Sequence, residues 1–358
     1  MNHFVILYNI ISRIDDMIGI ERLVEKVREK AEETSFSGVV SIFHGDESLY
    51  EEAFGYADRA EKRLNNVNTR FAIASGTKFF TALGIGTLID AGRLSLGTTM
   101  KEIFGGDLSY VDSQATIANL LSHTSGIFDY YDEELDIDEE NFFVDIPWFQ
   151  LETPSDYLPL FEGKIPKFPA GERYSYSNGG YVFLGIIIEK ITGQLYRDFI
   201  RENVFIPAGM MDSGFFSFTR LPENTAWGYK PNKDGTFDTN IYNLPIRGAS
   251  DGGLYTTLGD VRRVWISFRD YEILSEKLTE DYMTPHAVIN DRFRYGYGVY
   301  MRKHLNMDMV FFGGGDAGVG FDSRHIREIN LGITVISNIT DGEEQIRKAI
   351  LDHLENNP

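Results

Sequence analysis

Hydrophobic and polar residues follow two different periods near the start of the chain. Between residues 18 and 34, apolar side chains recur every three or four positions, which predicts an amphipathic helix. Two apolar runs follow at 37–43 and 48–56, and the polar segment 44–47 separates them. Short apolar runs on either side of a polar turn predict an antiparallel hairpin.

Longer apolar runs in the middle of the chain predict buried helices. Residues 81–90 and 181–190 are predominantly apolar, so no polar face would be left for solvent. A further helix is predicted over 260–271, with Thr257 near its N-cap, and another over 343–354.

Predicted strands dominate the last third of the chain. They fall at 294–301, 307–312, 318–323 and 331–338. Strands at both ends with helices between them indicate an α+β protein. We therefore expect a sheet domain built from residues 1–85 and 240–358, interrupted by a mostly helical domain over 86–239.

Composition restricts the possible chemistry. The chain has 358 residues, of which 42% are hydrophobic, and its formal net charge of −20 disfavours nucleic acids and anionic membranes as partners. It contains no cysteine, so disulfides, thiolate catalysis and cysteine-ligated zinc are excluded. The seven histidines show no metal-ligand spacing, and we expect neither a metal nor an organic cofactor.

Two segments bear on location and access. The apolar patch 4–8 is too short for a membrane span and lacks the basic flank of a signal peptide, so a cytoplasmic protein is expected, with a periplasmic or extracellular location as the alternative. Residues 130–145 carry eight carboxylates without the spacing of a calcium loop, which predicts a solvated loop or lid. The sequence leaves the oligomeric state open.

The first candidate for chemistry is Ser75 with Lys78. Residues three apart at the start of a helix lie on one face of its first turn, so the lysine amine can take the serine proton. The helix N-terminus adds partial positive charge where an oxyanion would form. By itself the pattern is weak, because a capped helix with a solvated lysine has the same residues.

Tyr176 and Asn178 supply the partners that this pair needs. A tyrosine hydroxyl near a lysine ammonium can have a lowered pKa and act as base in acylation and as acid toward the leaving group. The Asn178 amide can hold Lys78 and a substrate carbonyl. His123, within Ser122-His-Thr-Ser-Gly126, is expected to be a structural hydrogen-bonding residue.

The order of these motifs resembles the serine β-lactamase-related family over roughly residues 37–338. That family includes class C β-lactamases, low-molecular-weight penicillin-binding proteins, D-amino-acid-specific peptidases and esterases. The resemblance implies a β-lactamase/transpeptidase-like fold, in which an antiparallel sheet flanked by helices lies beside a mostly helical domain. It places the active site in the crevice between them and assigns the nucleophile to Ser75, the lysine to Lys78, and the tyrosine and asparagine to Tyr176 and Asn178.

The third motif of the family is altered here. Where relatives usually have Lys-Thr-Gly or His-x-Gly on a strand, the basic residue is replaced by Gly314, followed by Gly315, Asp316 and Ala317. Glycines let a substrate approach the strand edge. We expect the N–H of Asp316 or Ala317 to join that of Ser75 in an oxyanion hole. Without the basic residue, carboxylate-bearing substrates are disfavoured, and a basic residue introduced at position 314 is expected to restore them.

The sequence thus predicts a serine hydrolase that acts through an acyl-enzyme and needs no cofactor. Its expected partners are small esters, small amides or peptides, including those of D-amino acids. The alternative within enzymes is a D,D-carboxypeptidase, penicillin-binding protein or β-lactamase. A second alternative is a non-catalytic binding protein that retains the fold.

Overall fold

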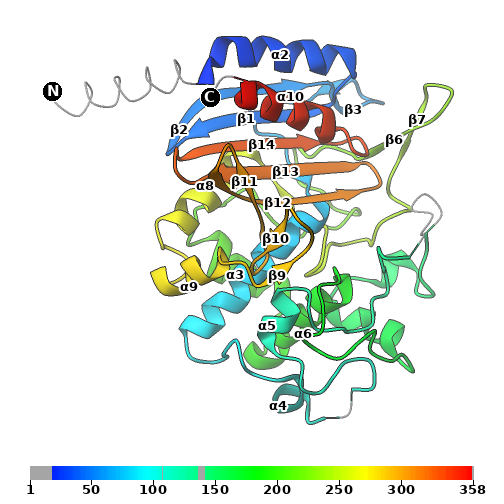
Figure 1. Ribbon diagram of the computed structural model, residues 1–358. Helices are drawn as coiled ribbons and strands as arrows, with labels where there is room; N and C mark the ends of the chain where they lie inside the picture. Colours follow the sequence, from blue (N-terminus) through cyan, green and yellow to red (C-terminus); the bar gives the residue numbers. More distant parts are fainter. Residues whose placement is uncertain (1–17, 107, 136–141, 357–358) are drawn as a thin grey trace.

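An eight-stranded antiparallel sheet forms the upper half of the molecule in Figure 1. The computed structural model describes residues 18–106, 108–135 and 142–356. In sheet order the strands are β2 (Glu47–Phe54), β1 (Gly38–His44), β14 (Leu331–Ser337), β13 (Val319–Ile326), β12 (Met307–Asp316), β11 (Tyr300–His304), β10 (Arg294–Tyr295) and β9 (Ala287–Val288). The sheet therefore joins both ends of the chain, since β1 pairs with β14 over their whole lengths.

Two helices from opposite ends of the chain cover one face of this sheet. They are α2 (Ile20–Glu33) and α10 (Glu343–Asn356), which lie side by side above it in Figure 1. The buried stripe of α2 consists of Leu23, Val27 and Ala31, as its apolar period predicts. These side chains join residues of β1, β14 and α10 in one apolar cluster.

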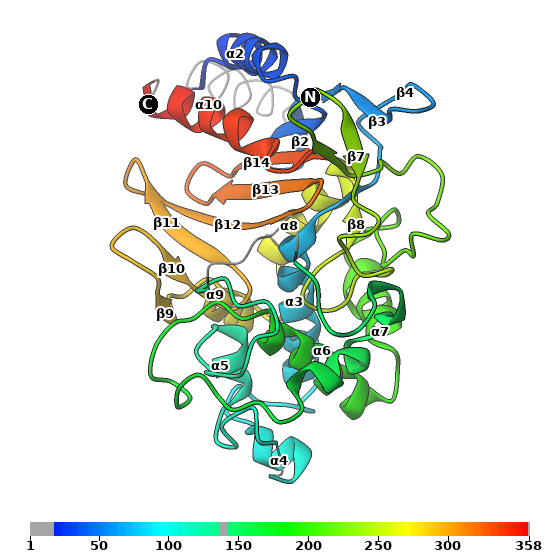
Figure 2. The same ribbon diagram turned by 90° about the vertical axis from the view of Figure 1, so that its right-hand side faces the viewer.

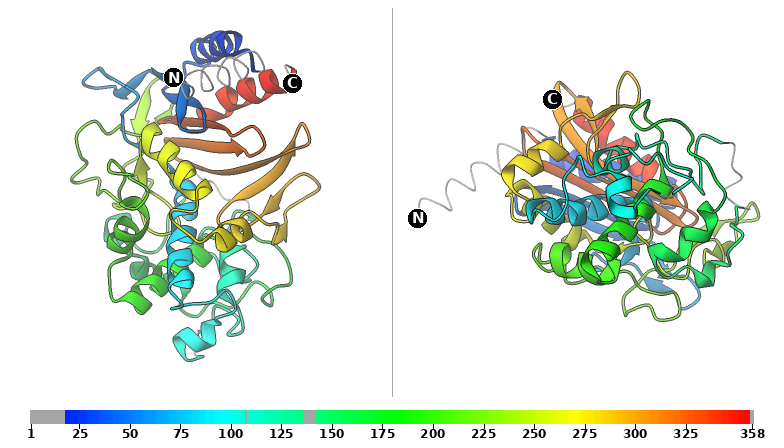
Figure 3. Two further views of the ribbon diagram at one scale, coloured as in Figure 1. Left: turned by 90° about the vertical axis from the view of Figure 1, so that its left-hand side faces the viewer. Right: turned by 90° about the horizontal axis from the view of Figure 1, so that it is seen from below.

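Three helices lie on the opposite side of the sheet, as Figure 3 shows: α3 (Thr77–Asp90), α8 (Leu258–Arg269) and α9 (Glu276–Tyr282). Phe79 of α3 stacks on Phe312 of β12 with ring centroids 4.5 Å apart, and it also contacts Trp265 and Phe268 of α8. This aromatic cluster connects α3 to the strand that borders the site.

Two glycines inside α3 show how tightly this helix is surrounded. A Cβ at Gly84 would lie 2.4 Å from Ile200, and one at Gly86 would lie 2.7 Å from Leu274. Glycine within a helix costs about 1 kcal/mol relative to alanine. Here the cost is offset because the neighbouring side chains pack directly against the helix backbone.

The remaining helices lie below the sheet in Figure 2. They are α4 (Met100–Phe104), α5 (Ile117–Leu121), α6 (Asn178–Thr192) and α7 (Tyr196–Ile200). Short helical turns add η1 (Ala74–Gly76), η2 (Trp148–Gln150), η3 (Pro154–Phe161) and η4 (Arg201–Phe205). Three small two-stranded sheets pair β3 (Tyr56–Asp58) with β4 (Arg63–Leu64), β5 (Phe71–Ala72) with β8 (Tyr255–Thr256), and β6 (Tyr229–Pro231) with β7 (Phe237–Thr239).

The predicted hairpin, the apolar helices and the C-terminal strands are confirmed, with one error in the last third. Residues 294–301 were expected to form one strand, but a turn over 296–299 divides them into β10 and β11. Gly298 in that turn has a φ of 76°, and a Cβ there would lie 2.6 Å from Ala82 of α3. The alternating pattern missed the turn because Gly296 and Gly298 interrupt the strand through their backbone rather than through polar side chains.

Other expectations remain predictions. The sheet draws its strands from 38–54 and 287–337, while the domain boundaries at residues 85 and 240 are untested. The N-terminal patch 4–8 lies outside the described residues. Across the part of the chain that the structure describes, none of the helices is long and apolar enough to cross a membrane.

Candidate active site

Ser75 lies in the short turn η1, directly before α3. The turn is fixed from both sides, because β5 before it pairs with β8 and the Thr77 hydroxyl after it donates to the Ala74 carbonyl at 2.7 Å. Ala74 adopts a φ of 43°, a left-handed conformation that non-glycine residues rarely take and that costs about 1–3 kcal/mol. The surrounding contacts hold this strained backbone and place Ser75 at the helix N-terminus.

Lys78 is buried, and three acceptors hold its amine. Nζ lies 2.9 Å from Ser75 Oγ, 2.7 Å from Asn178 Oδ1 and 2.7 Å from the Asp251 carbonyl oxygen. These contacts account for all three donors of an ammonium group. Burial lowers the pKa of Lys78, and the more distant carboxylates of Asp251, Glu133 and Asp129 only partly counteract it.

Asn178 reaches Lys78 from the start of α6, and a buried carboxylate positions it. Asp129 accepts hydrogen bonds from the backbone N–H groups of Asn178 and Gly179 at 2.7 and 2.9 Å. Burial raises the Asp129 pKa to about 7, although these two donors and Lys78 oppose the shift. A carboxylate at a helix N-terminus is favourable, so Asp129 fixes the end of α6 that carries Asn178.

Tyr176 lies beside the lysine, as expected, but its pKa shifts in the opposite direction to the prediction. Lys78 Nζ is 4.9 Å from the centre of the Tyr176 ring. Burial raises the Tyr176 pKa well above its ordinary value, and a side-chain hydrogen bond with Ser75 lowers it by less. The expected lowering was wrong because the ring is desolvated, so Tyr176 is a neutral hydroxyl at physiological pH.

His123 supports the segment that carries Tyr176 and Asn178. Its Nδ1 accepts a hydrogen bond from the Ser177 N–H at 3.0 Å, and its ring centroid lies 4.4 Å from that of Tyr176. Burial lowers its pKa well below the ordinary value, so the imidazole is neutral. This arrangement agrees with a structural role.

The strand β12 brings its glycines against the nucleophile. A Cβ at Gly314 would lie 2.5 Å from the Ser75 nitrogen and 2.6 Å from the Ile73 oxygen. No side chain fits at that position, so the expectation that a histidine or lysine at 314 would restore a positive charge is wrong. Side chains alternate along a strand. The residues on the same face as Gly314 are therefore Phe312, which is buried, and Asp316.

The same register identifies the backbone donor that faces the site. The β11–β12 hairpin closes at His304 and Met307 with two residues in left-handed conformation, which makes this a hydrogen-bonded pair. Backbone groups face the same side at every second residue, starting from Met307. Gly313 and Gly315 therefore direct their N–H and C=O groups toward the β11 side, where pairing has ended at Phe311. Of these two residues, Gly315 is the one that lines the pocket at Ser75.

The donors expected from the sequence are engaged elsewhere. Asp316 directs its backbone groups toward β13, and Ala317 N–H donates to Asp316 Oδ1 at 2.8 Å. Asp316 and Ala317, the donors expected from the sequence, therefore do not direct an N–H toward the open edge, whereas Gly315 does. The sequence could not show this, because the face of each N–H depends on the strand register.

Carboxylates line the mouth of the site. The pocket at Ser75 is bordered by Asn178, Gly315, Glu133, Asp251 and Asp316, and no lysine, arginine or histidine is among the described residues that line it. The acidic segment that includes Glu133 does border the site, and its residues 136–141 lie outside the described part. No cluster of metal-ligating side chains occurs among the described residues.

Asp129 is the functional residue that sequence reasoning missed. It follows the Ser122–Gly126 motif by three residues, but the helix end that it holds starts nearly fifty residues later. A cap on a distant helix leaves no local sequence signal, since capping patterns are read within one turn.

A family model described as beta-lactamase matches residues 22–356. The chain belongs to the beta-lactamase family. It is 30% identical to penicillin-binding protein 4* of Bacillus subtilis over 92% of its own length and 74% of that protein's. It is 23% identical to a teichoic acid D-alanine hydrolase of Staphylococcus aureus over 81% of this chain and 68% of that one.

Solved structures agree with this membership in the beta-lactamase family. A penicillin-binding protein from Bacillus halodurans is 37% identical, with a TM-score of 0.85 over 90% of this chain and 98% of that one. A D-amino acid amidase from Ochrobactrum anthropi shares the fold, with a TM-score of 0.78 over 94% of this chain and 100% of that one at 22% identity. The chain is accordingly a β-lactamase-related serine hydrolase of the acyl-enzyme type.

The close approach of β12 to Ser75 leads to a prediction. Gly314→Ala should lower kcat/KM for a simple ester by about 10²-fold or more, because the new Cβ pushes the strand or the serine out of position. Gly315→Ala is the matched control, since its Cβ would meet nothing closer than 3.6 Å and the N–H remains. Kinetics and thermal melts of both variants test this. Equal activity of the two would contradict the need for a side-chain-free position at 314.

Proposed function

We propose that Ser75 is the nucleophile and Lys78 its general base. The main support is the 2.9 Å contact between Lys78 Nζ and Ser75 Oγ, because it lies where burial lowers the pKa of the lysine. Asn178 Oδ1 and the Asp251 carbonyl hold two amine protons. The lone pair of the neutral amine then points at Ser75, where it can take the hydroxyl proton as the oxygen attacks a carbonyl carbon.

Tyr176 acts as the acid for the leaving group. As a neutral hydroxyl with a raised pKa, it holds its proton until the leaving oxygen or nitrogen develops negative charge. The Lys78 ammonium formed in the attack then returns a proton to the tyrosine. Water attacks the acyl-enzyme in the second half, and the same pair accepts its proton and gives one back to Ser75.

Two backbone donors hold the negative charge that forms on the carbonyl oxygen. Ser75 N–H lies at the start of the helix, and Gly315 N–H faces the open edge of β12 next to it. Donors that are already oriented before the reaction cost little reorganisation when the charge appears. This pair fits the tetrahedral intermediate of acyl transfer to and from a serine.

The substrates are esters or small amides that carry no carboxylate near the reacting carbonyl. Glu133, Asp251 and Asp316 line the mouth, and Phe312 occupies the strand face next to Gly314. An anionic substrate would meet repulsion instead of a charge-assisted hydrogen bond. The similarity to a teichoic acid D-alanine hydrolase and to a D-amino acid amidase supports small acyl substrates of this kind.

A penicillin-binding or D,D-carboxypeptidase activity is the second candidate. The observation in its favour is the 30% identity to penicillin-binding protein 4*. The carboxylate-rich mouth argues against it, because penicillins and D-Ala-D-Ala peptides carry a carboxylate close to the scissile bond.

The nucleophile can be tested by covalent labelling. The wild-type protein should react with a fluorophosphonate probe at Ser75, and Ser75→Ala should lose both labelling and ester hydrolysis while its melting temperature stays close to that of the wild type. Mass spectrometry of the digested adduct locates the modified residue. Hydrolysis that persists in Ser75→Ala would show that another nucleophile operates, and an unlabelled wild type would favour a non-catalytic binding protein.

The proton-transfer pair can be tested by combining substitutions. Lys78→Ala and Tyr176→Phe should each lower kcat by about 10²-fold or more, and the double variant should lose much less than the product, because the two groups act as one unit. In the wild type, activity should rise with pH through the lysine pKa, which lies below 10.5. The assignment would be contradicted if the free-energy losses of the two single variants simply added in the double variant. It would also be contradicted if the activity of Lys78→Ala rose with pH as that of the wild type does.

Substrate choice can be tested on one enzyme preparation. Each missing charge-assisted hydrogen bond corresponds to roughly 1.5–3 kcal/mol, or about a 10- to 100-fold preference. Neutral short-chain p-nitrophenyl esters should therefore show a higher kcat/KM than a chromogenic cephalosporin or a D-Ala-D-Ala peptide. Faster turnover of the carboxylate-bearing substrates would overturn the neutral-substrate proposal and support the second candidate.

A further inference from the structure

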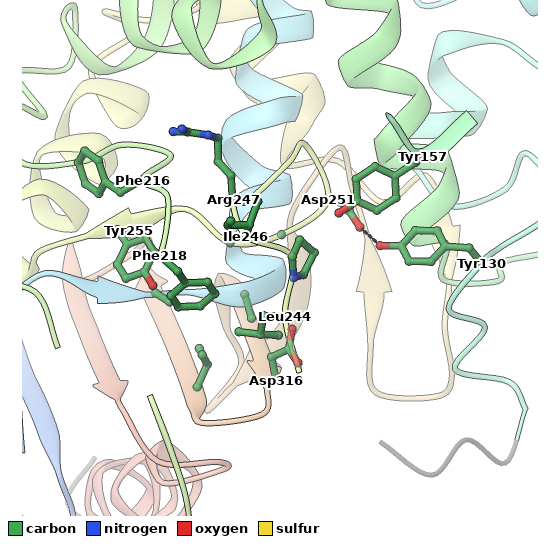
Figure 4. A pocket seen from close by; sticks show the side chains of 17 residues that line it. Tyr130, Tyr157, Phe216, Phe218, Leu244, Ile246, Arg247, Asp251, Tyr255 and Asp316 are labelled. Carbon is green, nitrogen blue, oxygen red and sulfur yellow. Dashed lines mark hydrogen bonds between the residues drawn. The ribbon is translucent and has the colours of Figure 1, made fainter. Parts of the chain in front are cut away.

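A second pocket opens beside the mouth of the active site (Figure 4). The linings of the two spaces have several residues in common, among them Ala74, Asp251, Gly252 and Asp316, so the two spaces adjoin. We call the second pocket the apolar chamber. Its own walls consist of Tyr157, Phe216, Phe218, Ile246, Tyr255 and Val319.

The charged groups of the apolar chamber are engaged or lie at its entrance. Tyr130 donates its hydroxyl to the Asp251 carboxylate. The Arg247 guanidinium donates to the Phe215 carbonyl at 2.7 Å, and in Figure 4 it points away from Asp316. The interior is therefore mostly aromatic and aliphatic surface, with the Asp316 carboxylate where the chamber meets the mouth. Such a lining favours an uncharged apolar group.

Strand β12 shows on which side of Ser75 the apolar chamber lies. Gly314 is directly at the serine nitrogen, and Asp316, two residues further along the same face, lines the chamber. Tyr176 lies toward the other end of the strand. The ring centroid of His123 lies 4.4 Å from that of Tyr176 and 4.7 Å from that of Tyr295. Tyr295 pairs with Tyr300, which in turn pairs with Phe311 of β12. The chamber and the tyrosine are thus on opposite sides of the nucleophile.

This order along β12 indicates on which side of Ser75 each half of the substrate lies. A general acid has to lie within hydrogen-bond reach of the leaving atom, so the leaving group lies on the Tyr176 side. The acyl substituent then extends the other way, toward Asp316. We propose that the apolar chamber is the acyl subsite and selects esters or amides of uncharged apolar acyl groups, such as branched aliphatic or phenyl-bearing ones. The proposal rests on the function assigned to Ser75.

The test compares two substrate series. In the first, p-nitrophenyl esters carry acetyl, propanoyl, butanoyl and phenylacetyl groups. The second series consists of methyl, propyl and butyl acetate, whose hydrolysis is measured by the acid that is released. Burying one methylene group of the substrate in an apolar site should raise kcat/KM by about fourfold. We expect kcat/KM to rise by about fourfold per methylene from acetyl to butanoyl, and to change by less than about twofold along the alcohol series.

Two variants and a control connect the gain to the apolar chamber. Phe216→Ala removes a half-buried wall residue and should flatten the acyl series, while turnover of the acetyl ester stays within about twofold. Ala72→Leu should narrow the chamber from β5 and abolish the preference for butanoyl and phenylacetyl groups. Phe237→Ala, a partly buried aromatic residue of β7 outside the chamber lining, should leave both series unchanged.

The outcomes separate this proposal from the one on which it rests. The acyl subsite would be overturned by a flat acyl series, by a gain along the alcohol series instead, or by equal effects of Phe216→Ala and Phe237→Ala. In each of these cases, Ser75-dependent turnover of the acetyl ester would leave the serine hydrolase assignment intact. Absence of Ser75-dependent turnover with every ester would overturn both. A rising acyl series that Phe216→Ala flattens and Phe237→Ala does not would support the subsite.

Discussion

The buried amine of Lys78 is the interaction on which the rest of the structure depends. A charged amine without water is costly unless its hydrogen bonds are satisfied. Here the acceptors are neutral and come from three separate places: Ser75 before α3, Asn178 at the start of α6, and the Asp251 carbonyl. These neutral acceptors satisfy the amine protons without adding a charge in direct contact, and burial lowers the pKa of Lys78 although carboxylates farther away partly oppose the shift.

The fold has to bring these three places together, and its unusual local features follow from that. Ala74 accepts a left-handed backbone so that Ser75 faces the lysine. Asp129 is buried, which raises its pKa, and it fixes Asn178 at the helix end. α3 contains Gly84 and Gly86 because the side chains of Ile200 and Leu274 pack against its backbone at these positions. Each of these features costs some stability.

The sequence predicted the fold class and the set Ser75, Lys78, Tyr176 and Asn178, which the structure brings together in one buried site. Apolar runs and motif order depend on local sequence, so they can be recognised without coordinates. The failures concern properties that arise only in three dimensions. The Tyr176 pKa depends on how completely the ring is desolvated, and which N–H group of β12 is available to an oxyanion depends on the edge that each N–H faces. Gly314 looked like a lost basic residue, yet it is glycine because the Ser75 backbone lies against it.

The pairing of β1 with β14 has a consequence for how the protein is made. These strands are adjacent in the sheet, and Ser37 and Asn338 share a hydrogen bond across 301 positions of the chain. At synthesis rates of about 5–20 residues per second, the ribosome needs about 15–60 s after β1 emerges before its partner exists. During that time the strand, nearly all of whose residues are buried in the finished protein, has only β2 beside it. Until β14 is made, the other edge of β1 is open to pairing with a second nascent chain.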